Sequence, residues 1–528
     1  MTLTIPREPL FILGLLRKAG FDASIVGGAV RDLVRHAPTE HTAAPPDYDF
    51  TTNATPEQIS ALFPESFYEN TFGTVSVTYE HLLEKLEIPL PVPPLMEPQS
   101  PQRIIDIAQA KKIHISLQSS LPSVESKPSE LFEPFEITTY RADGTYSDHR
   151  RPDAVTWGAT LRDDLDRRDF TINALALTVD DTLLFELLKN PTLTPEQLTL
   201  SENEFTIIDA HNGLQDLAEH RLVTVRNPEE RFQEDALRLL RAIRFSVQLN
   251  FEIADETFAA LTKLSPLIEH VSAERIRDEF LKMLASHYPK QAIELLDTTG
   301  LLQYILPELL QAKGVEQSGH HTTDVWTHSL DALEACPSSD PIVRLATLLH
   351  DIAKPQTAAQ IDGQITFYNH EVVGARTAKR IAERLRLSKH DCERMFILVR
   401  YHMFHYDKDH TDAAIRRFMR KVGLQHIDDI LALREGDRLG SGARKTSWRL
   451  EEMKERMIEQ LNQPLAVTDL ALNGTTLMQE LGLQPGPLIG ETLHYLFEQV
   501  LDTPELNTPE QLLELARTFL AQRTLSAA

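Results

Sequence analysis

Apolar residues follow two different patterns in the two parts of the chain. Between residues 22 and 140, short apolar runs alternate with turn residues, which is typical of β-strands; the clearest runs are residues 23–26, 48–50, 74–77 and 135–140. From about residue 214 onward, apolar residues recur at the spacing of amphipathic helices, most clearly over residues 231–245. The pattern predicts an α+β protein, with a small mixed sheet and its helices followed by an elongated all-α part.

Local signals place two helices in the sheet-containing head. The apolar run at residues 10–16 is too short to span a bilayer and predicts the first helix of the fold. Thr55 and Pro56 predict another helix, with Thr55 as the N-cap and Pro56 at the first helical position. Residues from about 85 to 132 carry more prolines than a packed strand can contain, so we expect an extended, partly disordered surface insertion there.

The composition narrows the class of protein. The chain has 528 residues, enough for several domains, and its net charge of -25 argues at first sight against a polyanionic partner. Local basic groups decide such binding, however, and arginines cluster over residues 141–168 and 226–244. The two cysteines form neither a disulfide framework nor a zinc cage, so we expect a cytoplasmic protein without a membrane segment.

A glycine pair precedes two carboxylates that are one residue apart. Gly27 and Gly28 let the backbone approach a phosphate closely, because no Cβ blocks the way. Asp47 and Asp49 would lie on one face of a strand, where both can hold the same pair of Mg²⁺ ions. Two such ions clamp the attacking and leaving oxygens of an in-line phosphoryl displacement. The arrangement predicts a metal-dependent nucleotidyl transfer site.

The segments around these residues make the prediction specific. In chain order they read Gly27-Gly28-Ala29-Val30-Arg31-Asp32, Asp47-Tyr48-Asp49, Phe72-Gly73-Thr74-Val75, Glu136-Ile137-Thr138-Thr139-Tyr140-Arg141 and Arg167-Arg168-Asp169-Phe170-Thr171-Ile172-Asn173-Ala174. The series resembles the class II CCA-adding tRNA nucleotidyltransferases and their bacterial poly(A) polymerase relatives, over roughly residues 20–285.

The resemblance assigns roles to residues of the head. It implies that Asp47 and Asp49 hold the catalytic Mg²⁺ ions, and that Glu136, one strand away, is the third carboxylate. The residues expected to face the triphosphate or to close the site around it are Gly27, Gly28, Arg31, Arg167, Arg168, Asp169 and Asn173. Arginines suit this purpose because they neutralise phosphate charge.

A later segment, residues 234–242, predicts how the base is selected. On one helix, Asp235 and Arg238 share a face, so an acceptor lies beside a donor. Cytosine and adenine present an amino donor beside a ring-nitrogen acceptor, whereas guanine and uracil present a carbonyl and a ring N–H. Asp235 and Arg238 can therefore select C and A, with Arg241 as a further nucleotide-binding candidate. The alternative is an ordinary salt bridge on a helix surface.

The resemblance implies template-independent addition of C, C and A to the 3′ end of tRNA from CTP and ATP. Residues 72–77 and 146–153 are similar to the CCA-adding group rather than to the poly(A) polymerases. The helical part would bind the acceptor and T arms of tRNA through arginines, by shape and phosphate contacts. CC-only addition, A-only addition and poly(A) synthesis stay open as alternatives, and so does the oligomeric state.

The helical part carries a second candidate metal site. Its residues resemble the ligand set of the HD phosphohydrolase superfamily: His328, His350, Asp351 and Asp437, to which His370 and His402 could add ligands or acid–base groups. Imidazole and carboxylate groups suit Mn²⁺, Fe, Ni²⁺ or Zn²⁺, which would assist hydrolysis of a phosphate ester, such as one at an RNA end. Two alternatives are an RNA-end phosphohydrolase whose head only binds, and a structural body with ordinary buried histidines.

These features divide the chain into four parts. We expect a nucleotidyltransferase head at residues 1–180, with the insertion at about 85–132, and a helical neck and body at residues 181–315. The neck and body would select nucleotides and bind tRNA. An HD-type metal-dependent domain at residues 316–450 and a helical tail at residues 451–528 follow.

Overall fold

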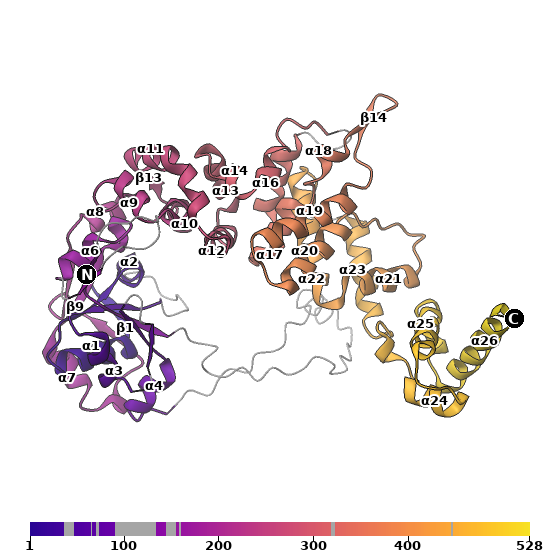
Figure 1. Cartoon of the computed structure of the whole chain (residues 1–528), viewed down its shortest axis with the longest axis horizontal. Helices are drawn as coiled ribbons and strands as arrows, with labels where there is room; N and C mark the ends of the chain where they lie inside the picture. Colours follow the sequence, from indigo (N-terminus) through magenta and orange to yellow (C-terminus); the bar gives the residue numbers. More distant parts are fainter. Residues whose placement is uncertain are drawn as a thin grey trace. The chain divides into compact units, whose positions relative to one another are not determined.

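The computed structural model describes residues 1–35, 47–64, 66–69, 73–89, 134–143, 155–157, 160–317, 323–444 and 447–527. Within these residues, the chain forms two compact units that divide between residues 307 and 308 (Figure 1). The first unit contains a mixed sheet and a series of helices after it, and the second is almost entirely helical. The α+β prediction is therefore confirmed.

A seven-stranded sheet forms the centre of the first unit. Its order is β11-β9-β2-β3-β6-β5-β4, and every neighbouring pair is antiparallel except β3 and β6, which run parallel. The strands are β2 (Ala23–Val26), β3 (Asp49–Thr52), β4 (Phe67–Glu69), β5 (Thr74–Val77), β6 (Phe135–Thr139), β9 (Leu175–Val179) and β11 (Phe205–Asp209). All four strands predicted from the apolar runs are present.

The sheet extends further along the chain than the predicted head. β9 pairs with β2, and β11 pairs with β9, so the sheet ends at Asp209 and a head boundary at residue 180 is too early. Most side chains of β11 are only partly buried, so its sequence gives a weak strand signal. Short strand pairs outside the sheet are β1 (Leu3–Pro6) with β10 (Gln197–Leu200), β7 (Arg141–Asp143) with β8 (Val155–Trp157), and β12 (Arg221–Leu222) with β13 (Glu252–Ile253).

Helices pack on this sheet, and two of them confirm local predictions. α1 (Arg7–Lys18) contains the apolar run, and its Leu10 is buried in one core with Phe50 of β3. α3 (Pro56–Leu62) begins with a capping box, in which Thr55 and Gln58 each accept a hydrogen bond from the backbone N–H of the other. The other helices here are α2 (Gly28–Arg35), α4 (Tyr79–Lys85), α6 (Leu161–Asp166), α7 (Asp181–Leu187) and α8 (Gly213–Ala218). Residues 90–133, with most of the expected proline-rich insertion, lie outside the described residues.

The helices that follow the sheet begin with a break. α9 (Pro228–Glu234) and α10 (Leu237–Leu249) are separate, so the prediction of one helix over residues 231–245 is wrong. Between them Asp235 is extended, and its carboxylate accepts a hydrogen bond from the N–H of Leu237 at 3.0 Å. A short acidic side chain that bonds the nearby backbone competes with helical hydrogen bonds, which explains the break. α11 (Asp255–Leu264), α12 (Ala273–Leu284), α13 (Pro289–Thr298) and α14 (Leu302–Ile305) complete the unit.

In the second unit, α16 (Val325–Ala335) and α22 (Ile427–Gly440) approach each other closely. A Cβ on Gly440 would lie 2.5 Å from the backbone nitrogen of Ala332, and one on Gly436 would lie 2.6 Å from its carbonyl oxygen. The other elements are α15 (Pro307–Leu310), α17 (Pro341–Leu349), α18 (Lys354–Thr357), β14 (Ala359–Ile361), β15 (Gln364–Thr366), α19 (His370–Arg384), α20 (Lys389–Tyr401), α21 (Asp412–Val422), α23 (Trp448–Gln460), α24 (Gly474–Leu481), α25 (Pro487–Asp502) and α26 (Pro509–Ala527). In the part of the chain that the structure describes, no helix is both long and apolar enough to cross a membrane.

Candidate functional sites

Three carboxylates gather at the start of β3 and β6. Because these strands are parallel neighbours, their register places Asp49 opposite Glu136, while Asp47 lies just before β3 rather than on it. The pKa of Asp49 is raised to about 6, most strongly by burial; Asp47 and Glu136 also raise it, whereas Arg168 and Arg241 lower it. Clustered carboxylate oxygens with mutual repulsion fit Mg²⁺, which prefers oxygen ligands.

The glycine turn lies directly beside these carboxylates. Gly27 joins β2 to α2 with φ at +79°, a conformation that favours glycine. A Cβ at this position would lie 2.8 Å from Nη1 of Arg168 and 3.7 Å from Oδ2 of Asp49. The backbone, a guanidinium group and a candidate metal-binding carboxylate therefore lie together, an arrangement that suits a metal-bound triphosphate.

Four of the predicted nucleotide-binding residues form one hydrogen-bonded chain. Nη1 of Arg31 donates to Oδ1 of Asn173 at 2.6 Å, and Nδ2 of Asn173 donates to Asp169 at 3.1 Å. Nε of Arg241 donates to the other oxygen of Asp169 at 2.7 Å. Burial alone would raise the pKa of Asp169, but Arg241 and Arg238 hold it well below its usual range. The network keeps Asp169 ionised and fixes the two arginines at the site.

The other arginines predicted to bind nucleotide, Arg167, Arg168 and Arg238, lie against acidic partners or the backbone. Arg167 donates twice to Asp164, which is fully buried, at 2.9 and 2.7 Å. Arg168 lies 3.6 Å from the same carboxylate. Arg238 donates to Glu234 at 2.7 Å and to the carbonyl of Arg167 at 2.8 Å. The arginines are therefore positioned before any phosphate arrives.

The predicted Asp235–Arg238 pair does not form. Asp235 lies in the break between α9 and α10, where it accepts hydrogen bonds from Nη1 and Nη2 of Arg275 at 3.2 and 2.8 Å. Arg238 is paired with Glu234 instead. Arg275 of α12 was not among the predicted site residues, because it lies far along the chain and only the packing of α12 against α10 brings it to Asp235.

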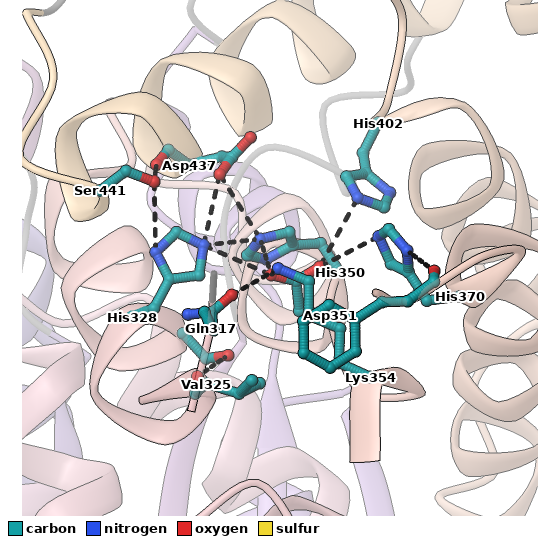
Figure 2. Close-up of polar contacts among 12 residues, drawn as sticks. Gln317, Val325, His328, His350, Asp351, Lys354, His370, His402, Asp437 and Ser441 are labelled. Atoms are coloured by element: carbon teal, nitrogen blue, oxygen red, sulfur yellow. Dashed lines mark hydrogen bonds and ion pairs between the residues drawn. The ribbon is translucent and has the colours of Figure 1, made fainter. Parts of the chain in front are cut away.

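The second unit brings together the four principal residues of the predicted metal site (Figure 2). Nε2 of His328 lies 3.1 Å from Nε2 of His350, 3.4 Å from Oδ2 of Asp351 and 3.3 Å from Oδ1 of Asp437. Nε2 of His350 lies 3.1 Å from Asp351 and 3.7 Å from Asp437. In Figure 2, His328 of α16, Asp437 of α22, and His350 and Asp351 of the turn after α17 point toward one another. The glycine contacts of α22 with α16 allow Asp437 to approach His328.

A second set of ligand groups shares the same aspartate. Nε2 of His370 and Nε2 of His402 lie 3.3 and 3.8 Å from Oδ1 of Asp351. Both nitrogens are buried, and within the residues that the structure describes neither forms a hydrogen bond. Burial, together with His350, lowers the pKa of His402 to about 3, which keeps its imidazole neutral. Buried imidazole nitrogens around a carboxylate form a donor set that fits a divalent transition metal.

Backbone carbonyls orient three of these histidines. Nδ1 of His350, His370 and His402 each lies 2.7 Å from the carbonyl oxygen of the residue three positions earlier. A proton on Nδ1 leaves Nε2 with a free lone pair toward the centre, which is the tautomer that a metal ligand needs.

Most of the candidate metal ligands line an open cavity of about 490 Å³, namely His350, Asp351, His370, His402 and Asp437. Two basic side chains form ion pairs with the aspartates of this site. Lys354 Nζ lies 2.6 Å from Asp351, and Arg434 Nη1 lies 2.6 Å from Asp437. Both also line the cavity, where they could bind a phosphate group next to the metal. The sequence analysis missed both, because isolated basic residues carry no motif.

A sheet that presents carboxylates on neighbouring strands, beside a glycine turn and positioned arginines, defines a nucleotidyltransferase. Known families agree. The family "Poly A polymerase head domain" matches residues 23–90 and 97–223. "Probable RNA and SrmB-binding site of polymerase A" matches residues 250–313, and "tRNA nucleotidyltransferase domain 2" matches residues 377–516.

Individual proteins extend this agreement. The A-adding tRNA nucleotidyltransferase of Deinococcus radiodurans is 33% identical over 383 residues, which cover 70% of this chain and 80% of the relative. The CCA-adding enzyme of Ligilactobacillus salivarius is 28% identical over 520 residues, 98% of this chain and 97% of the relative. That of Leuconostoc citreum is 33% identical over 305 residues, but this match spans only 56% of the relative. The chain belongs to the class II CCA-adding tRNA nucleotidyltransferase and poly(A) polymerase family.

The fold has a solved counterpart. The Bacillus stearothermophilus CCA-adding enzyme, solved in complex with CTP, matches with a TM-score of 0.62 at 22% identity, over 98% of both chains. Phe72 and residues 146–153, on which the preference for CCA addition partly rested, lie outside the described residues.

Proposed function

We propose that this protein adds C, C and A to the 3′ end of tRNA, with CTP and ATP as substrates. One observation carries the proposal: the parallel pairing of β3 with β6 brings Asp49 and Glu136 together, and Gly27 and Arg168 lie against Asp49. Relatives named A-adding tRNA nucleotidyltransferase and CCA-adding enzyme support tRNA as the acceptor.

The roles in the head follow from the charges of its residues. Asp47, Asp49 and Glu136 would hold Mg²⁺, which supplies charge neutralisation for an in-line displacement at the α-phosphate. Arg168 would bind the triphosphate where it approaches the backbone of Gly27. Asp169 stays ionised and holds Arg241, so this part of the site does not reorganise when the nucleotide binds.

Base selection would use the break between α9 and α10. Asp235 presents a carboxylate there, held in place by Arg275, and it can accept a hydrogen bond from the amino group of cytosine or adenine. Arg238 would exchange its bond to Glu234 for one to the ring nitrogen. Guanine and uracil would leave the carboxylate facing a carbonyl oxygen, which is unfavourable.

An extension assay with Mg²⁺ tests this function. The acceptors are tRNA molecules that end before, within and after the CC positions, and each labelled nucleotide is given alone and in combination. Addition of C, C and A followed by a stop is the expected result. Addition of A only, or of C only, would replace the proposal with a partial activity, and a long A tail would indicate poly(A) synthesis. No incorporation would refute the proposal.

A second function is supported by the metal-binding groups of the second unit: hydrolysis of a phosphate ester, for example at an RNA end. His328, His350, Asp351 and Asp437 would hold one divalent transition metal ion. Asp351 would also be a ligand of a second ion, together with His370 and His402. Such metals generate hydroxide from water near neutral pH. Lys354 would bind the phosphate group beside Asp351.

Metal analysis and hydrolysis of 2′,3′-cyclic AMP together test this second function. We expect the purified chain to hold Mn, Fe, Ni or Zn, and the variant Asp351→Asn to lose both metal and hydrolysis. A chain that neither binds these metals nor cleaves an ester would instead have a structural helical body.

We also infer a cytoplasmic location. The two cysteines, Cys336 and Cys392, are both buried and free, which suits a reducing compartment.

A further inference from the structure

Side chains of two chemical kinds line the cavity of the candidate metal centre. Lys354, Arg434 and Arg438 are basic. Ile365 of β15, Phe367, Tyr368 and Met403 are apolar or aromatic, and they are called the aromatic wall below. Hydrolysis of a phosphate ester requires the metal ligands and benefits from the basic residues, but it does not require the aromatic wall.

Tyr368 is the most exposed aromatic residue of this wall. Its side chain is 70% exposed, although large apolar groups are normally covered. Among the described residues it has no hydrogen-bond, ion-pair or ring partner that would explain its position. Next to it Phe367 is covered on one side, where Nζ of Lys354 lies 5.5 Å from the centre of its ring.

The backbone on both sides of Tyr368 is fixed. Before it, β14 and β15 form an antiparallel hairpin, which Figure 1 shows standing out from the helices of this unit. The carbonyl of Phe367 then lies 2.7 Å from Nδ1 of His370. After it, Asn369 adopts φ of 63° and α19 begins. An exposed ring is therefore held two residues from a metal-binding histidine.

A nucleotide matches both kinds of lining residue. Its phosphate suits the metal and Lys354, and its base is a flat aromatic surface that stacks on tyrosine regardless of base identity. A volume of about 490 Å³ is far larger than a phosphate group needs. A substrate without a base, such as a sugar or glycerol phosphate, would leave Tyr368 without a contact.

We propose that Tyr368, held by the β14–β15 hairpin, stacks on the base of a nucleotide whose phosphate group lies at the metal centre. The proposal rests on the proposed hydrolase function of this centre and adds the residue that distinguishes nucleotides from other phosphate esters. The nucleotide can be free or can be the last residue of an RNA chain, and the two sources share the same chemistry.

Equilibrium binding to the full-length chain tests the proposal without any reaction. Calorimetry, with and without Mn²⁺, would measure the Kd of adenosine 3′-monophosphate and of inorganic phosphate. We expect Tyr368→Ala to raise the Kd of the nucleotide about ten-fold and to leave that of phosphate unchanged. Tyr368→Phe should stay within about two-fold of the unchanged protein, because the ring is retained. Tyr288→Ala, a change at an exposed tyrosine of the first unit, is the matched control.

Equal loss of nucleotide and phosphate binding in Tyr368→Ala, or no loss of either, would overturn the proposal. An oligoribonucleotide with a 3′-phosphate distinguishes a free nucleotide from the end of an RNA chain. If it binds more tightly than the mononucleotide and this binding still depends on Tyr368, the ligand is an RNA end. If it binds more weakly, the ligand is a free nucleotide.

Kinetics separate this proposal from the hydrolase function itself. For 2′,3′-cyclic AMP, Tyr368→Ala should raise KM with little change in kcat, whereas both constants for glycerol 2-phosphate should stay the same. If the unchanged protein cleaves neither ester, the hydrolase function fails, and the binding experiment still decides the role of Tyr368. If it cleaves both and Tyr368→Ala affects them equally, only the role of Tyr368 fails.

Discussion

At Asp49, burial and neighbouring charge both act on a single carboxyl group. Burial and the carboxylates of Asp47 and Glu136 raise its pKa, whereas Arg168 and Arg241 lower it. The resulting pKa is about 6. Such a group is costly to ionise without a cation, and the site gains stability when one binds. Strand register explains why the sequence could place this cluster, since Asp49 and Glu136 each stand at the start of an easily recognised strand.

The residues proposed to select the base were harder to place. The sequence identified Asp235 and Arg238, but it paired them with each other, because a continuous helix would put them on one face. In the structure each pairs elsewhere, Asp235 with Arg275 and Arg238 with Glu234. A partner from another helix depends on tertiary packing, which no local pattern in the sequence contains.

Asp235→Ala should relax the choice of base. Without the Asp235 carboxylate, the carbonyl oxygen of guanine or uracil no longer faces another acceptor. That unfavourable contact costs about 1–3 kcal/mol of binding free energy per group. We expect kcat/KM for CTP and ATP to fall and the preference over GTP and UTP to narrow by roughly 5- to 150-fold. Steady-state rates with each nucleotide measure this. Asp255→Ala, at an exposed position of α11, is the control, and unchanged selectivity in Asp235→Ala would refute the assignment.

Among the helices, the apolar period alone was misleading over residues 231–245. Both α9 and α10 carry buried apolar residues, Phe232 on one and Leu240 and Ile243 on the other, so the spacing continues through the break. The local sign of the interruption is Asp235, which accepts a hydrogen bond from the N–H of Leu237, but aspartate also occurs inside helices. Where capping and proline signals coincided, as at Thr55 and Pro56, the predicted helix start was correct.

A buried ion pair joins α10 to α12. Nε of Arg244 donates to Glu279 at 2.5 Å, and both side chains are largely buried. Glu279→Ala would leave Arg244 without this partner, so we expect the free energy of unfolding to fall by about 3 kcal/mol or more. Urea unfolding followed by circular dichroism measures the loss. The double variant Arg244→Met with Glu279→Leu should recover most of it; if the double variant is as unstable as the single one, the pair is not the cause.

The contact between α16 and α22 depends on the absence of side chains. Gly440→Ala would place a Cβ 2.5 Å from the backbone of Ala332 and push the helices apart. We expect a loss of about 1–3 kcal/mol of stability and a lower metal content, because Asp437 would move away from His328. Gly490→Ala on α25, where a Cβ meets nothing within 4 Å, is the matched control. Full metal content in Gly440→Ala would show that this packing does not position the site.

At the scale of the whole molecule, the two units carry two chemically different candidate sites. Oxygen ligands in the head suit Mg²⁺, and imidazole ligands in the second unit suit softer metals. The sequence predicted the α+β class correctly. It also proposed both ligand sets, because each contains a close pair of recognisable residues, Asp47 with Asp49 and His350 with Asp351. It could not predict Lys354, Arg434 or the aromatic wall, which only the fold brings to the second site.

The two activities should be separable by single substitutions. Asp49→Asn should lower nucleotide addition on the order of 10³-fold or more and leave ester hydrolysis unchanged. Asp351→Asn should abolish ester hydrolysis and leave nucleotide addition unchanged. After complete metal removal, Mg²⁺ alone should restore nucleotide addition, and Mn²⁺ or Ni²⁺ should be needed for hydrolysis. Rates of both reactions on the same protein preparations measure this, and a loss of both activities in either variant would contradict it.

Three histidines of the second unit stand at helix ends and lie against carbonyls of their own backbone. His350 follows α17, His370 begins α19 and His402 follows α20. Each imidazole therefore points correctly only while its helix end is ordered. A cobalt ion in this centre would act as an optical reporter: its visible absorption during heating would record fraying of these three helix ends before the chain as a whole has melted.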